Sequence, residues 1–141
     1  MFVLDTDTYT HLVQKHPRVV ARVSTAYEQG ERVAITIITK AEILRGRIDA
    51  LLKADSDERF LFAQQHLVAT EEALQEIRVL TIDASSLRCF HDLKDLRGLK
   101  KTGRADLLIG SIVLASDATL ATRNQKHFRA IPRLKITNWV D

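Results

Sequence analysis

The stretch FVLDTD, residues 2–7, places three apolar residues directly before Asp5 and a second acid, Asp7, two positions later. Phe2 to Leu4 are typical of a short buried strand. A carboxylate that is buried without a partner costs several kcal/mol of folding free energy. The stretch therefore predicts either a solvated strand end or carboxylates that meet a cation.

Working outward from this stretch, short apolar segments alternate with helical patterns. Further strands are predicted at 32–38, 78–82, 118–122 and 134–139, and helices at 8–16, 17–30, 39–54, 55–77, 83–98, 105–116 and 124–131. Such alternation predicts a parallel sheet of four to five strands with helices on both faces, a three-layer α/β/α sandwich. Ligands bind such sheets beyond the carboxyl ends of the strands, which is where Asp5 is expected.

Composition fits a soluble globular protein. The 141 residues are 45% hydrophobic and 28% charged, and they carry one cysteine. We expect a single domain over residues 1–141. The lone Cys89 cannot form an internal disulfide, and we find neither a secretory signal nor a membrane-spanning run. These features predict a cytoplasmic protein that does not span a membrane.

Positive charge gathers in one segment. The formal net charge is only +3, but LKDLRGLKKTGR, residues 93–104, holds five basic residues, with Arg88 just upstream and Asp92 and Asp95 as the nearby acids. This stretch predicts either a solvated surface or a patch that contacts phosphates, as an RNA partner would require.

Polar side chains from four separate segments are expected at the carboxyl edge of the sheet. Asp5 and Asp7 follow the first strand, Glu42 lies near the start of the helix after the second, Asp106 opens an apolar helix, and Asn124 follows the fourth strand. Oxygen ligands of this kind suit Mg²⁺ or Mn²⁺. A metal bound there would lower the pKa of a water molecule and stabilise charge on a phosphate.

Most of these residues also have a structural explanation. Thr39 and Glu42 have the spacing of a capping box, and Asp106 is an acid of the type favoured at a helix N-terminus. Asp7 and Asn124 are both good N-cap residues.

Asp5, in contrast, has no evident structural role in the sequence. The two residues that precede Asn124 also have alternative interpretations. Thr122 either hydrogen-bonds the site carboxylates or simply ends the strand, and Arg123 either reaches a phosphate or is solvated.

Other reactive residue types give weaker signals. The five histidines lack zinc-ligand spacing. His127 is expected near the site, more as a surface residue than as a substrate contact. Ser111 is expected to pack inside its helix, because no histidine and acid flank it in the pattern of a catalytic triad.

Four motifs together resemble those of PIN domains, particularly the VapC-type toxins of bacterial toxin–antitoxin pairs. They are FVLDTD, TKAEILRG, ADLLIGSIVLA and LATRNQKHF, and the resemblance runs from Phe2 to about Trp139. It implies an α/β/α fold and a metal-dependent ribonuclease whose acids are Asp5, Glu42 and Asp106.

Two positions depart from the family pattern. Asn124 stands where many relatives have aspartate, so it offers a carbonyl oxygen without charge, and a second metal should bind less well. Asp7 stands where asparagine is common. Our hypothesis is that its extra carboxylate partly replaces the charge missing at Asn124.

The resemblance also implies a mechanism and partners. A metal held by Asp5 and Asp106, with Glu42 directly or through water, would activate a water for in-line attack on RNA and leave a 3′-hydroxyl and a 5′-phosphate. Relatives bind an antitoxin and form homodimers, and residues 45–67 are candidates for the antitoxin surface.

Two other functions stay open. One is a catalytically weak module that binds nucleic acid with a DNA-binding antitoxin in transcriptional regulation, which Asn124 favours. The other is an unrelated phosphatase-like enzyme, which is disfavoured because the expected nucleophile pattern is absent.

Overall fold

Five parallel strands form the centre of the computed structural model, which describes residues 1–141. The strand order is β3-β2-β1-β4-β5, so the first strand of the chain is the middle of the sheet. The strands are β1 (Phe2–Leu4), β2 (Val33–Thr36), β3 (Arg78–Leu80), β4 (Thr119–Ala121) and β5 (Lys135–Thr137). The predicted parallel α/β/α architecture is confirmed.

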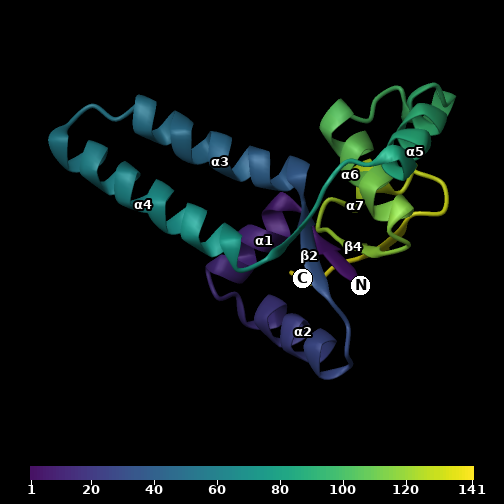
Figure 1. The fold of residues 1–141 in the computed structure, drawn as a ribbon, viewed down its shortest axis with the longest axis horizontal. Helices are drawn as coiled ribbons and strands as arrows, with labels where there is room; N and C mark the ends of the chain where they lie inside the picture. Colours follow the sequence, from purple (N-terminus) through teal and green to yellow (C-terminus); the bar gives the residue numbers. More distant parts are fainter.

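Seven α-helices and one short 3₁₀ helix connect and cover these strands (Figure 1). The α-helices are α1 (Thr6–Val13), α2 (Pro17–Glu28), α3 (Ile37–Leu52), α4 (Asp57–Gln75), α5 (Ala84–Lys94), α6 (Arg104–Ala115) and α7 (Gln125–Phe128); the 3₁₀ turn spans Arg97–Leu99. None of the helices is long and apolar enough to cross a membrane.

Neighbouring residues of the central strands point to opposite faces of the sheet, which creates two cores. Val3 and Leu120 are buried among the side chains of α5, α6 and α7, whereas Leu4 and Ala121 are buried with those of α1, α2 and α4. This two-residue alternation is the geometry of a strand covered on both sides. The parallel pairing of Leu4 with Ala121 brings the carboxyl ends of β1 and β4 together.

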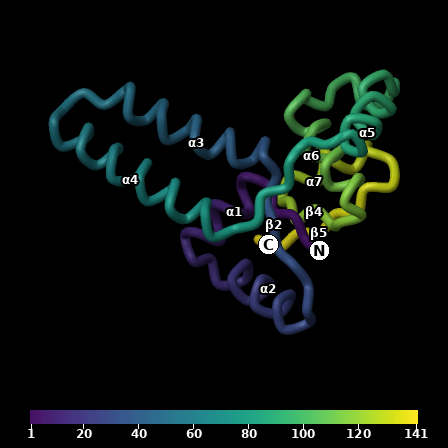
Figure 2. The backbone as a smooth tube through the Cα atoms, in the orientation of Figure 1, coloured from purple at the N-terminus to yellow at the C-terminus, as the bar shows by residue number.

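Helices α3 and α4 form a long hairpin that extends away from the sheet (Figures 1 and 2). They span 16 and 19 residues, so α4 is about 28 Å long at 1.5 Å per residue. The outer part of the hairpin leaves large apolar side chains exposed, namely Ile48, Leu52, Phe60, Leu61, Phe62 and Val68.

The predicted boundaries differ from the observed ones by a few residues. The strand predicted at 32–38 ends at Thr36, because Ile37 and Ile38 already belong to α3. The Thr36 hydroxyl accepts a hydrogen bond from the Thr39 backbone N–H (3.1 Å) and so caps the helix early. Local capping therefore outweighs the strand preference of the two isoleucines.

Candidate active site

Asp5 lies at the carboxyl end of β1, buried, with only 7% of its surface exposed. Its Oδ1 accepts a hydrogen bond from the Thr8 backbone N–H (2.8 Å), and its Oδ2 accepts one from the Thr122 hydroxyl (2.5 Å). Asp5 is thus the N-cap of α1. The sequence interpretation, which gave Asp5 no structural role and offered Asp7 as the cap, is wrong because the helix begins at Thr6.

Thr122 connects the ends of β1 and β4. Its side chain is fully buried, and its hydroxyl oxygen also accepts a hydrogen bond from the Asn124 backbone N–H (3.0 Å). One hydroxyl therefore holds the Asp5 carboxylate and the start of the turn into α7. The first of the two roles considered for Thr122, a hydrogen bond to a site carboxylate, is present in the structure.

Glu42 approaches the same edge from α3. Its Oε1 accepts a hydrogen bond from the Thr6 hydroxyl (3.2 Å). Partial burial raises the pKa of Glu42 above its ordinary value, and the negative charges of Asp106 and Asp5 raise it further, against the Thr6 hydrogen bond, which lowers it. The tip of the side chain remains exposed, so the loss of surrounding water is partial. Glu42 therefore lies near enough to Asp106 and Asp5 for their negative charges to act on it.

The capping box predicted from Thr39 and Glu42 is not formed. Thr36 is the N-cap of α3, and Thr39 is buried three residues into the helix. Glu42 lies in the second turn, beyond reach of the cap. Its side chain is therefore free of the structural role that competed with a functional one.

Asp106 lies in the first turn of α6 and is half-buried. Its Oδ2 is 3.1 Å from Nδ1 of His127, and the same ring nitrogen is 2.8 Å from Nδ2 of Asn124. One nitrogen cannot donate to the carboxylate and accept from the amide at once, so the two contacts belong to different tautomers or amide orientations. His127 thus brings Asp106 and Asn124 together, although its own ring is mostly exposed.

The sequence placed His127 near the site as a surface residue but did not predict its contacts with Asn124 and Asp106. Asn124 occupies the N-cap position of α7, but its side chain makes no capping hydrogen bond and contacts His127 instead. The signal was available in NQKH, because residues three apart on a helix are neighbours. The contact to Asp106, which is 21 residues away in the sequence, was not available.

Three other residues considered from the sequence lie apart from the carboxylate cluster. Asp7 is exposed, and its Oδ1 lies 3.6 Å from Nδ1 of His11, which is not a site residue. Arg123 donates from Nε to Asp141 Oδ2 (3.3 Å). Ser111 is buried and donates to the Leu107 carbonyl oxygen (2.6 Å), which fits the packing role expected for it.

The basic residues of the predicted phosphate patch lie between the end of α5 and the start of α6. Lys94, Arg97, Lys100 and Lys101 are exposed, and Arg104 lies over the Phe90 ring, 5.1 Å from its centroid. Arg104 is two residues from Asp106. In the sequence the patch therefore leads into the helix that carries Asp106, and its exposed charges are available to attract a polyanion.

The donor set at the edge consists of oxygen atoms, which suits a hard divalent cation. No three His, Cys, Asp or Glu side chains are positioned to hold one ion directly. Mg²⁺ commonly keeps several waters and binds through one or two carboxylates, so the arrangement fits an ion held partly through water. Burial raises the pKa of Glu42 most and the charges of Asp106 and Asp5 raise it further, and a nearby cation would offset both effects.

The whole chain is similar in sequence to known proteins. No family model matches the chain. Ribonuclease VapC1 of Haemophilus influenzae strain R2866 is 27% identical to it, and the alignment covers 99% of this chain and 98% of that protein. Ribonuclease VapC2 of Rickettsia felis is 26% identical with the same coverage. The chain is thus similar over nearly its whole length to proteins named as VapC ribonucleases.

Solved VapBC structures share the fold. A chain of VapBC2 from Rickettsia felis, crystallised with a DNA fragment from its promoter, superposes with a TM-score of 0.76 at 25% identity, covering 98% of both chains. VapBC-1 from nontypeable Haemophilus influenzae gives a TM-score of 0.77 at 24% identity, covering 99% of this chain and 98% of that chain. The resemblance to VapC-type toxins inferred from the four motifs is confirmed over the whole chain.

Proposed function

We propose that the chain is a metal-dependent endoribonuclease that acts as the toxin of a type II toxin–antitoxin pair. The observation that carries this proposal is the meeting of Asp5, Glu42 and Asp106 at the carboxyl edge of the sheet in a chain similar to proteins named as VapC ribonucleases. The three acids come from β1, α3 and α6, so only the folded chain brings them together.

In this proposal Asp5 and Asp106 would hold a divalent cation, Mg²⁺ or Mn²⁺, with Glu42 as a ligand directly or through water. A bound cation supplies Lewis acidity toward phosphate oxygens and lowers the pKa of a coordinated water. Asn124 adds a neutral oxygen beside Asp106. This donor set favours one ion over two, because only three of the four positions carry charge.

The chain's own residues preorganise this arrangement. The Thr8 N–H and the Thr122 hydroxyl orient the Asp5 carboxylate, so it needs no reorganisation when a substrate arrives. The Thr6 hydroxyl orients Glu42 in the same way. His127 restrains Asp106 through the contact between its Nδ1 and the carboxylate, and its ring is exposed enough to contact an RNA strand.

An antitoxin is the partner that the α3–α4 hairpin suits. Its exposed apolar side chains lie within the predicted segment 45–67, apart from Val68, and include Leu52, Leu61 and Phe62, which are 75%, 63% and 67% exposed. Apolar groups clustered at this exposure mark protein interaction surfaces. Solved neighbours of the chain are VapBC toxin–antitoxin complexes, which supports an antitoxin as the occupant.

A homodimer is part of the same proposal. A second copy would use the helices after β2 and the surface near the carboxyl edge, as the resemblance to VapC-type toxins implies. Light scattering on the antitoxin-free protein checks this expectation: a mass near twice 16.0 kDa agrees with it, and a mass near 16.0 kDa contradicts it.

Cleavage of a labelled total-RNA pool tests the proposed activity. Purified protein free of antitoxin is incubated with Mg²⁺, with Mn²⁺ or with EDTA, beside Asp5→Ala. We expect discrete fragments with either metal, none with EDTA, and none from the variant.

The result that overturns the proposal is a folded wild-type protein that cuts no RNA with either metal. That outcome would favour the nucleic-acid-binding module, in which the chain serves transcriptional regulation together with a DNA-binding antitoxin. Cutting that persists in EDTA would retain a ribonuclease but reject the metal.

A further inference from the structure

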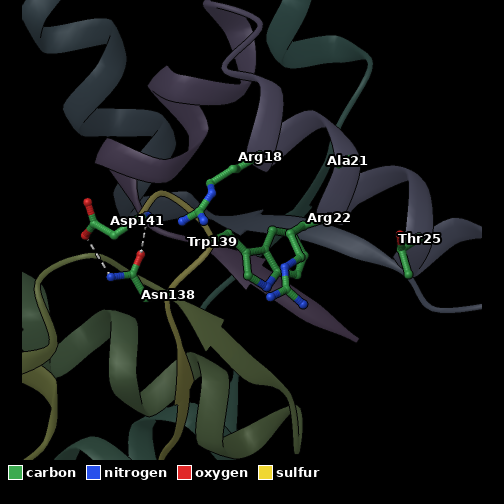
Figure 3. A pocket seen from close by; sticks show the side chains of 7 residues that line it. All are labelled: Arg18, Ala21, Arg22, Thr25, Asn138, Trp139 and Asp141. Atoms are coloured by element: carbon green, nitrogen blue, oxygen red, sulfur yellow. Dashed lines mark hydrogen bonds between the residues drawn. The ribbon is translucent and has the colours of Figure 1, made fainter.

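A polar pocket of about 380 Å³ lies between α2 and the segment that follows β5 (Figure 3). Figure 3 shows Arg18 and Arg22 extending from α2 toward this segment. Neither arginine forms an ion pair within the chain. The residues that line the pocket are Arg18, Ala21, Arg22, Thr25, Asn138, Trp139 and Asp141.

Direct contacts connect this pocket to the candidate active site. Thr122 holds the Asp5 carboxylate, and the next residue, Arg123, contacts Asp141 at the rim of the pocket. Because Asn138 follows β5 as Thr122 follows β4, both lie at the carboxyl edge of the parallel sheet. A polymer seated at Asp5 can therefore continue along this edge toward Arg18 and Arg22.

The chemistry of the pocket favours an anion. The Asp141 carboxylate accepts hydrogen bonds from Asn138 Nδ2 (2.9 Å) and Arg123 Nε (3.3 Å). The Asn138 hydrogen bond lowers the pKa of Asp141, and the charges of Arg123 and Arg18 lower it further. The Asp141 carboxylate is thus contacted by donors from two separate segments, the turns after β4 and β5, and lies near Arg18 of α2.

We propose that this pocket binds a backbone phosphate of the RNA substrate away from the scissile bond, with Arg18 and Arg22 as its cationic side chains. This inference rests on the proposed ribonuclease function. Trp139 is buried and offers no free face for a base to stack on, so the contact is with the backbone and independent of sequence. Asp141 weakens the pocket, because its charge opposes that of the phosphate.

Binding of single-stranded RNA in EDTA tests the proposal without cleavage. The probe is a fluorescein-labelled 16-nucleotide RNA of randomised sequence, followed by anisotropy from low to moderate salt. We expect Arg18→Ala and Arg22→Ala each to weaken binding about fivefold. The slope of log K against log salt should become shallower by roughly 0.7 for each phosphate that the variant no longer neutralises. The matched control is Arg32→Ala, which removes an exposed arginine at the opposite end of the sheet.

A second variant should strengthen RNA binding instead of weakening it. Asp141→Asn keeps the shape of the side chain and removes its charge, so binding should tighten about twofold to threefold. Asp117→Asn is its control, because Asp117 also pairs with one basic residue, Lys135, but lies at the far end of β4. Melting temperatures of all variants verify that they fold.

The outcomes separate this inference from the function on which it rests. If wild type cuts RNA while the arginine variants bind with its affinity and salt slope, the pocket proposal is overturned and the nuclease stands. Arginine-dependent binding by a wild-type protein that cuts nothing would support the pocket and overturn the nuclease. If wild type neither binds nor cuts RNA, both are overturned.

Discussion

The carboxyl edge of the sheet and the outer α3–α4 hairpin differ in which side chains they expose and in whether those side chains have partners within the chain. At the edge, polar groups have partners within the chain whether they are buried or exposed: Asp5 with Thr8 and Thr122, Asp106 with His127. On the hairpin, apolar groups such as Leu61 and Phe62 are exposed and lack partners within the core. The edge is organised by the chain itself, whereas the hairpin presents a surface that another molecule can complete.

Because of this difference, substitutions in the two regions should affect different properties of the protein. Changes at the edge should alter both chemistry and stability where a side chain is shared between them, as for Asp5. Changes on the outer hairpin should alter association alone, because exposed side chains contribute little to the free energy of unfolding.

The largest expected effect is loss of cleavage after removal of an edge carboxylate. Asp5→Ala should lower kcat/KM at least about 100-fold and also destabilise the fold by about 2–4 kcal/mol, because α1 loses its cap and Thr122 its acceptor. Asp106→Asn should cause a similar loss of activity with little change in stability. Cleavage kinetics and urea unfolding measure the two effects, and a destabilised Asp106→Asn would remove the distinction.

Next in size is the effect of charge on the hairpin. Phe62→Glu should weaken binding of the cognate antitoxin about 30-fold or more, since buried aromatic anchors dominate interfaces. Its melting temperature should match wild type. Tyr27→Glu, at a similarly exposed aromatic on α2, is the control, and calorimetric titration is the measurement. Equal affinity for Phe62→Glu and wild type would place the antitoxin elsewhere.

A smaller effect is expected from removal of the hydroxyl that joins β1 and β4. Thr122→Val keeps the shape but leaves Asp5 Oδ2 without a donor and the Asn124 N–H without an acceptor. Unfolding should be easier by about 1–3 kcal/mol, with a partial loss of activity from the less restrained Asp5. Thr122→Ser should restore both properties, and a serine variant as impaired as valine would speak against the hydroxyl.

The smallest effect concerns the pH dependence of the metal-free protein. Burial and the neighbouring acids raise the pKa of Glu42, so folding favours its protonated form. That contribution to stability is present below the ordinary glutamate pKa and is lost as pH rises through the raised value. In EDTA, Glu42→Gln should therefore be slightly more stable than wild type at pH 7, and the difference should shrink below about pH 4. Thermal unfolding across this range checks the sign.

Much of the architecture was predictable because it follows from repeated local patterns. FVL, RVLTI and ATLAT alternate with helical segments, and that alternation alone predicts a parallel sheet with Asp5 at its carboxyl edge. Of the three acids suspected from the sequence, Asp5 and Asp106 lie near enough to Glu42 for their charges to act on it. Helix starts were less predictable, since Thr36 and Asp5 cap their helices earlier than the apolar pattern suggests.

The partners of the site residues were not predictable, because they come from distant positions. Thr122 reaches Asp5 across 117 residues, and His127 reaches Asp106 from a different helix. No local spacing encodes such contacts. The role of Asp141 at the α2 pocket was missed for the same reason: its partner Arg123 is 18 residues away and on another strand end.

The chemistry of the RNA ends produced by cleavage tests the central claim most directly, because His127 lies beside the carboxylates and histidine-based ribonucleases use the 2′-hydroxyl of the substrate. A single-site RNA substrate is cut in Mg²⁺, and the same substrate is prepared with a 2′-deoxy residue at the cleaved position. Attack by water predicts 5′-phosphate and 3′-hydroxyl ends and continued cutting of the deoxy substrate. A 2′,3′-cyclic phosphate, with no cutting of the deoxy substrate, would contradict a metal-dependent hydrolase built on Asp5, Glu42 and Asp106.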